Sequence, residues 1–130
     1  MTAANGSGAG EEIRLSVPAS LEYVRIVRLT TSAMASRFGF DVDEIENLRV
    51  AVDELSSTIV ESAGSGELSI AISETGGDFC IEGWAPIESG RSLELDQLTA
   101  QILNAVCDKY ELRVADGAAR FVCLRRLPTN

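Results

Sequence analysis

Apolar and polar positions along the first half of the chain predict a strand followed by two helices. Residues 13–17 alternate between apolar and polar types and end before a proline, a pattern typical of a half-buried strand. Residues 21–38 have the apolar period of an amphipathic helix and end before a glycine. Residues 43–63 repeat that period and end before a Gly-Ser-Gly sequence. We therefore expect two consecutive helices after the first strand.

The second half of the chain predicts a hairpin, a third helix and two further strands. Alternating segments at residues 68–73 and 79–84 flank a Gly-Gly turn, which is a hairpin signal. The remaining predicted elements are a loop, a helix and two strands, at residues 85–92, 95–109, 110–114 and 120–127. This order of elements favours an α+β fold: a two-layer sandwich with three helices on one face of a mostly antiparallel sheet.

Each predicted helix has an apolar arc that we expect to face the sheet. In the first helix this arc consists of Tyr23, Val24, Val27, Thr31, Met34 and Phe38. In the second it consists of Ile45, Leu48, Val52, Leu55 and Ile59. In the third it consists of Leu95, Leu98, Ile102, Ala105 and Val106.

The first helix has more apolar residues than one buried face requires. Ile26 and Leu29 lie roughly opposite the predicted buried arc, and charged side chains border them. These bordering residues are Glu22, Arg25 and Arg28. An apolar patch with a charged rim predicts a protein interface. The alternative is a helix packed on both sides within its own fold, with arginines that are only solvated.

The second helix has a polar face opposite its apolar arc. Glu54 and Thr58 lie one turn apart on this face. A carboxylate in that position can act as a base, and the neighbouring hydroxyl is a weak ligand for a hard cation such as magnesium. Glutamates are common on solvated helix faces, so a purely solvent-exposed role is the alternative.

Composition limits the classes of function. The 130 residues fit one domain at 11–130, and residues 1–10 have the Gly, Ser, Ala and Asn composition of a disordered tail. A net charge of −9 disfavours binding to nucleic acid or to an anionic membrane. No apolar segment is long enough for a membrane span and no signal peptide is recognisable, so we expect a cytoplasmic protein.

The chemistry-bearing residue types exclude several kinds of site. The chain has no histidine, which removes Ser-His-Asp and Cys-His triads. The three cysteines, Cys80, Cys107 and Cys123, are widely spaced, so no zinc or other metal site is predicted. We expect these cysteines to be small hydrophobes in strands and a helix of a protein from a reduced compartment. Any catalysis would depend on carboxylates.

Two segments resemble a known protein family. Residues 22–32 and 35–39 are similar to the first helix of RsbW-type and SpoIIAB-type anti-sigma factors, which are serine-protein kinases. Residues 43–54 resemble the approach to the N box of that family. With the first strand and the hairpin, the resemblance covers residues 13–84. It implies the GHKL (Bergerat, histidine-kinase-like ATPase) fold.

The resemblance also implies partners and a switch. Members of the family form homodimers that hold an alternative sigma factor away from RNA polymerase. An anti-anti-sigma protein with a STAS domain releases the sigma factor and is itself phosphorylated by the kinase. Carried over by position, the general base of the N box falls on Glu54 and its magnesium-binding asparagine falls on Thr58. On the first helix, the expected sigma contacts are Glu22, Arg25, Arg28 and Leu29.

The chain departs from the family pattern at the nucleotide site. Thr58 replaces the asparagine, and a hydroxyl is shorter than an amide carbonyl. The Asp-x-Gly-x-Gly motif is missing, because Ala85 falls at its aspartate and Ile87 at its first glycine. Loss of the adenine acceptor typically costs about 1–3 kcal/mol. The lid is short and has no Gly-rich phosphate cradle. Glu82 is an alternative adenine contact if its side chain faces the helices.

These departures predict a binding protein with a vestigial nucleotide site. In this interpretation the chain sequesters a sigma factor without phosphorylation and needs no cofactor. Two alternatives stay open: an active serine/threonine-protein kinase that uses ATP and magnesium, and a scaffold that kept only the fold.

Overall fold

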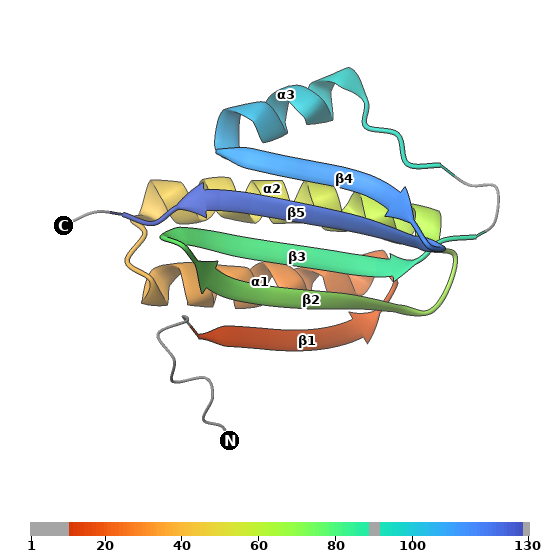
Figure 1. Cartoon of the computed structure of the whole chain (residues 1–130), viewed down its shortest axis with the longest axis horizontal. Helices are drawn as coiled ribbons and strands as arrows, with labels where there is room; N and C mark the ends of the chain where they lie inside the picture. Colours follow the sequence, from red (N-terminus) through yellow and green to blue (C-terminus); the bar gives the residue numbers. More distant parts are fainter. Residues whose placement is uncertain (1–10, 89–91, 129–130) are drawn as a thin grey trace.

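The computed structural model describes residues 11–88 and 92–128 of the chain. The predicted disordered tail at residues 1–10 lies outside the described residues. Five strands form one antiparallel sheet in the order β1-β2-β3-β5-β4, with three helices beside it (Figure 1). The predicted two-layer α+β sandwich, with its helices on one face of the sheet, is confirmed.

The strands follow the predicted alternation and are slightly longer than predicted. Their bounds are Glu12–Pro18 (β1), Glu67–Thr75 (β2), Asp78–Pro86 (β3), Lys109–Ala115 (β4) and Ala118–Arg126 (β5). The β2–β3 hairpin turns at Gly76 and Gly77, whose φ angles are +60° and +87°. Such angles suit a two-residue hairpin turn and favour glycine. The hairpin prediction is therefore confirmed.

The loop predicted at residues 85–92 was expected to begin two residues earlier than it does in the structure. Ala85 and Pro86 were expected to open the loop at residues 85–92, yet both belong to β3 and pair with Ala119 and Ala118 of β5. Proline lacks an amide hydrogen but is tolerated at the end of a strand, where one donor fewer is needed. The loop therefore begins at Ile87.

Helices α1 (Leu21–Arg37) and α2 (Val42–Ala63) cover the same face of the sheet (Figure 1). The Asp41 carboxylate accepts from the Glu44 backbone N–H at 2.8 Å, and the Glu44 carboxylate accepts from the Asp41 N–H at 3.1 Å. This capping box satisfies two backbone donors and fixes the start of α2. The predicted apolar arcs of both helices face inward, because their central residues are buried.

The third helix, α3 (Gln97–Val106), is shorter than the predicted residues 95–109. The Asp96 side chain accepts from the Thr99 backbone N–H at 2.7 Å and so caps the first turn. At the other end, Cys107 already has extended backbone angles. The predicted helix therefore loses residues at both ends.

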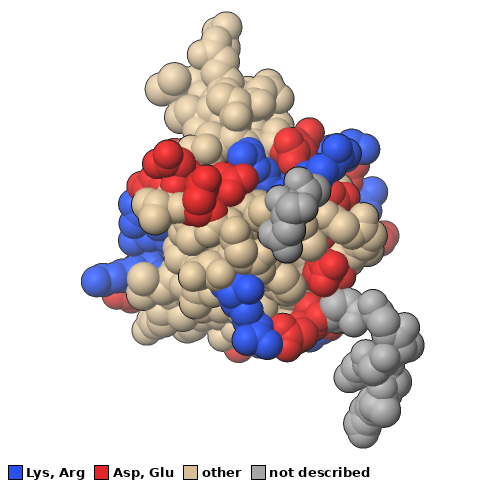
Figure 2. Space-filling view, turned by 90° about the vertical axis from the view of Figure 1, so that its left-hand side faces the viewer, with Lys and Arg blue, Asp and Glu red and all other residues tan. Residues whose placement is uncertain are grey.

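The predicted apolar stripe of α3 is wrong in part. Leu98 and Ala105 are exposed, whereas Leu103, which was not in the stripe, is fully buried. α3 lies next to the edge strand β4 (Figure 1), so only its C-terminal half reaches the core. The helix contains no charged residue and forms the uncharged projection at the top of Figure 2.

The core lies between the helices and the sheet. Its largest members are Phe79 on β3 and Phe121 on β5, both fully buried. The rings of Phe38 and Phe40, in the link between α1 and α2, meet Phe79 edge to face at centroid distances of 5.6 and 5.5 Å. These contacts hold α2 against the sheet in the orientation that positions its polar face.

Candidate functional site

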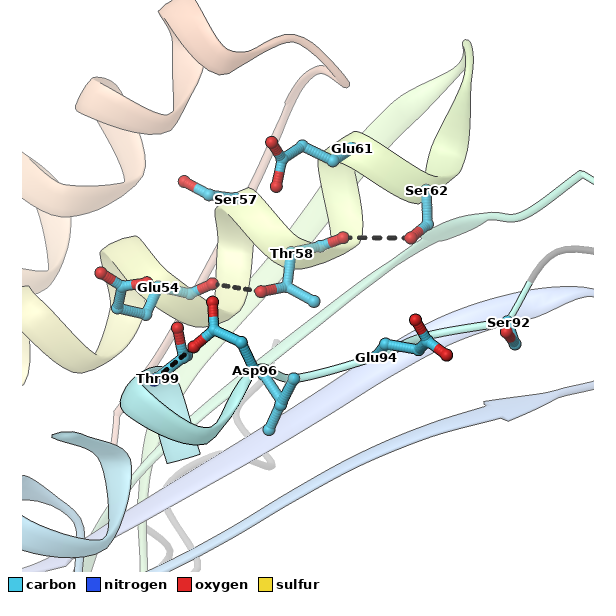
Figure 3. Close-up of a pocket in the computed structure, with 10 residues that line it drawn as sticks. Glu54, Ser57, Thr58, Glu61, Ser62, Ser92, Glu94, Asp96 and Thr99 are labelled. Atoms are coloured by element: carbon cyan, nitrogen blue, oxygen red, sulfur yellow. Dashed lines mark hydrogen bonds between the residues drawn. The ribbon is translucent and has the colours of Figure 1, made fainter. Parts of the chain in front are cut away.

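A groove of about 330 Å³ separates the polar face of α2 from the segment that leads into α3 (Figure 3). It is lined by Glu54, Ser57, Thr58, Glu61, Ser62, Ser92, Glu94, Leu95, Asp96 and Thr99. Both N-box positions predicted from the sequence, Glu54 and Thr58, therefore belong to one concave surface. Most of the other lining residues come from a segment that the sequence analysis did not connect with α2.

On the α2 side of the groove, hydroxyl and carboxylate side chains lie on successive turns of the helix. The Thr58 hydroxyl donates to the Glu54 backbone carbonyl at 2.8 Å, and the Ser62 hydroxyl donates to the Thr58 carbonyl at 3.2 Å (Figure 3). These bonds to the preceding turn use the hydroxyl hydrogens and leave oxygen lone pairs as acceptors. Thr58 can therefore offer only a lone pair of its hydroxyl oxygen to a cation.

The α3 side of the groove contributes Asp96, a residue that sequence analysis missed. Its carboxylate accepts the Thr99 N–H, and that hydrogen bond holds the pKa of Asp96 below its usual value. Figure 3 shows this side chain facing Glu54 and Thr58 across the groove. An aspartate three residues before a threonine at a helix start is a cap signal. That signal was available, but the helix was predicted to begin at residue 95, two residues before the first residue of α3.

The described lining of the groove is acidic. Its lining includes the carboxylates of Glu54, Glu61, Glu94 and Asp96, and no lysine or arginine among the described lining residues. Phosphates bind at helix N-termini through free backbone N–H groups. At α3 the Asp96 carboxylate already takes the Thr99 N–H and adds a negative charge there. The described lining therefore offers no positively charged side chain to a phosphate.

The resemblance placed the adenine contact at Ala85 or, as an alternative, at Glu82, both on β3. Ala85, at the position of the motif aspartate, is fully buried on the helix-facing side of β3 and has no polar side-chain atom. Glu82 was an alternative contact only if it faced the helices. Its neighbours Ile81 and Gly83 are buried toward the helices, so Glu82 points to the opposite face, 3.9 Å from Arg120. The Glu82 alternative is therefore wrong.

The outer surface of α1 carries a mixed apolar and charged patch. Leu29 and Ile26 are 59% and 44% exposed, and Glu22 and Arg25 are exposed beside them. We call these four residues the α1 patch. The alternative of a helix packed on both sides within the fold does not hold, because this side of α1 is open in the described chain.

Arg28 differs from the other predicted contact residues on α1. Its guanidinium donates to the Asp53 carboxylate of α2 at 3.0 Å, and its side chain is only 30% exposed. Arg28 thus links α1 to the residue that precedes Glu54. A partner that contacts Arg28 would meet a side chain already engaged in this ion pair.

Comparison with known proteins assigns the chain to a family. The serine-protein kinase RsbW of Halalkalibacterium halodurans is 30% identical over an alignment of 127 residues, which covers 82% of this chain and 78% of that protein. The chain belongs to the RsbW family. The serine-protein kinase RsbW of Bacillus thuringiensis (strain Al Hakam) is 41% identical over 63 residues, or 46% of this chain and 39% of that protein. No family model matches the chain.

The RsbW fold is also found by structural comparison. A crystal structure of the RsbU and RsbW domains of Rv1364c from Mycobacterium tuberculosis superposes with a TM-score of 0.72 at 16% identity. The match covers 90% of this chain and 32% of that chain. This likeness confirms the fold predicted from the RsbW resemblance. In the described part of the chain, no helix combines the length and apolar character needed to cross a membrane.

Proposed function

We propose that this RsbW-family protein is an anti-sigma factor that sequesters an alternative sigma factor through the α1 patch. The observation that supports this proposal most is the contrast between two surfaces. The α1 patch has the exposed apolar and charged character of an interface, whereas the described lining of the groove at Glu54 is acidic and includes no lysine or arginine. Binding is therefore the activity that the residues favour.

Release of the sigma factor would follow from competition by a STAS-domain partner. In this proposal the partner binds without being phosphorylated, and the protein works as a homodimer in the cytoplasm. Glu54 is then a vestige of the general base, and Thr58 a vestige of the magnesium ligand. No ATP or magnesium is needed for either the bound or the released state.

An active serine/threonine-protein kinase is the second candidate. Glu54 and Thr58 still line one groove, one turn apart, and the relatives carry the name serine-protein kinase. In that case ATP and magnesium would bind at this groove. The acidic lining is the observation against it, because a bound cation would have to offset several negative charges before the phosphates could enter.

The anti-sigma proposal is tested by direct binding with matched variants. Purified chain is titrated against each alternative sigma factor of the source organism, and the Kd is measured by calorimetry. One sigma factor should bind, and the Arg25→Glu, Leu29→Asp double variant should weaken it by about tenfold or more, because a charged side chain would enter an apolar contact. Arg28 is left unchanged, since its replacement would also break the ion pair with Asp53.

The control variant carries the same kinds of substitution, leucine to aspartate and a basic residue to glutamate, on a surface away from α1. Leu98 on α3 is 66% exposed and Lys109 on β4 is exposed, so a Leu98→Asp, Lys109→Glu variant matches the charge change at a different surface. We expect its Kd to equal that of the unaltered chain. Equal losses in both variants would exclude the α1 patch as the contact. Absence of binding to every sigma factor would refute the anti-sigma role.

A further inference from the structure

Two cysteine thiols meet inside the core. The Sγ atoms of Cys107 and Cys123 lie 3.2 Å apart, although the two residues are 16 positions apart in the sequence. Cys107 directly follows α3, and Cys123 lies on β5 facing the helices. A disulfide bond is about 2.05 Å long, so the sulfur atoms need to approach by only about 1 Å. The exposed fraction is 8% for Cys107 and 0% for Cys123.

The surroundings of the two thiols shift their pKa values in opposite directions. The hydrogen bond from the Cys123 thiol lowers the pKa of Cys107, against the opposing effect of burial, and the charge of Arg125 acts in the same lowering direction. Arg125 donates to the Val106 carbonyl at 2.7 Å, which holds the guanidinium beside Cys107. The same contact with Cys107, together with burial, raises the pKa of Cys123. Cys107, the more accessible of the pair, is therefore the thiol better suited to act as a thiolate nucleophile.

We propose that Cys107 and Cys123 are a redox modification site that forms an intramolecular disulfide on reaction with a hydroperoxide. The Cys107 thiolate attacks the peroxide O–O bond and becomes a sulfenic acid, and with hydrogen peroxide one water leaves after protonation. The Cys123 thiol then attacks the Cys107 sulfur, which forms the S–S bond and expels a second water. The sulfurs lose two electrons and the peroxide gains them. A dithiol reductant reverses the reaction.

The disulfide would tie α3 to the middle of the sheet. Within α3 itself only Leu103 is buried, so the helix is held mainly by its C-terminal half. β5 is paired on both sides, with β3 and β4, and is a rigid anchor. A bond at Cys107 therefore fixes the end of the helix whose other end carries Asp96 and borders the groove.

Cys80 provides an internal control because it lies on the other face of the sheet. It pairs by Cα position with Leu124, the residue that follows Cys123, so its side chain points away from the Cys107–Cys123 pair. Burial, followed by the charges of Glu82 and Asp78, raises the pKa of Cys80. Its thiol is therefore less nucleophilic at neutral pH. A Cys80→Ser chain keeps the proposed pair and simplifies the assay.

The experiment uses the full chain with Cys80→Ser and hydrogen peroxide as the oxidant. After oxidation the protein is alkylated in denaturant without reductant, and its intact mass and peptide map are measured. We expect both remaining thiols to become unavailable for alkylation, with loss of the mass of two hydrogens and a peptide crosslink between Cys107 and Cys123. The midpoint of thermal unfolding should rise by several degrees and return after dithiothreitol.

Variants with Cys107→Ser or Cys123→Ser in the same background should form no intramolecular crosslink. If a serine variant fails to fold, the peptide map of the Cys80→Ser chain decides alone, because it locates the bond without a core substitution. Two alkylatable thiols after oxidation, a sulfinic acid at Cys107 without a crosslink, or a bond between two chains would each overturn the proposal.

Discussion

At the residue scale, Gly83 on β3 has no room for a side chain. A Cβ atom at this position would overlap the Phe121 ring and lie 3.0 Å from the Ile70 side chain. All three residues are buried in the layer between sheet and helices. Here glycine is required for the space it leaves, since its φ angle is not in the positive range.

Replacement of Gly83 by alanine should destabilise the fold by about 1–3 kcal/mol, because the added methyl group overpacks the core. Urea unfolding monitored by the fluorescence of Trp84 measures the change. A Gly83→Ala, Phe121→Leu double variant should lose less stability than the sum of the two single changes, since the smaller side chain makes room for the methyl group. An unchanged midpoint in the single variant would show that the Phe121 ring moves aside without cost.

Some residues of the candidate site could be predicted from the sequence, and others could not. Glu54 and Thr58 were predicted from the resemblance to the N box, to which their one-turn spacing added a weaker signal, and both line the groove. The cap pattern before α3 could have indicated Asp96 as a capping residue, but its place in the groove depends on how α3 approaches α2, which no local pattern records. Arg28 was expected as a partner contact, yet the structure also pairs it with Asp53, 25 positions away.

At the element scale, sequence patterns predicted elements well where one period continued over many residues. The arcs of α1 and α2 were correct because each helix packs along most of its length against the sheet. The stripe of α3 was wrong in part because half of that helix projects past the core, so apolar residues such as Leu98 are exposed. Periodicity shows which residues share a face of a helix. Which of them are buried depends on how far the sheet and the neighbouring helix extend along that face.

The capping box of α2 gives a second stability prediction. Asp41→Ala removes the acceptor for the Glu44 N–H and should cost about 1 kcal/mol of unfolding free energy. Asp41→Asn keeps an acceptor oxygen and should cost much less, so it serves as the matched control in the same urea titration. Equal losses for the two variants would assign the effect to charge at the helix start instead of to the hydrogen bond.

At the scale of the whole molecule, we expect charge to oppose nucleotide binding. The chain has a net charge of −9, and four carboxylates belong to the described lining of the groove at Glu54. The electrostatic field of the whole chain and the carboxylates of the groove should therefore both disfavour an anionic ligand. The long-range part is screened by salt, whereas carboxylates on the two walls of one groove act at short range and are screened less.

Calorimetric titration of ATP into the purified protein, with magnesium and then with EDTA, should give no binding heat at about millimolar ATP. The result should be the same for a Thr58→Asn variant, which restores the family's magnesium ligand but leaves the acidic groove and the alanine at position 85. Micromolar, magnesium-dependent binding to the unaltered chain would instead support the kinase alternative. Binding only to the variant would identify Thr58 as the decisive loss.

The strand order has a consequence for how the chain reaches its fold during synthesis. β5 comes after every other strand in the sequence, yet it lies between β3 and β4 inside the sheet. Until residue 126 has left the ribosome, β3 therefore has an open edge and β4 has no neighbour to pair with. A truncation before residue 118 removes an interior strand, whereas loss of β1 removes only an edge strand. The completed sheet, with the helices packed against it, thus depends on the part of the domain that is translated last.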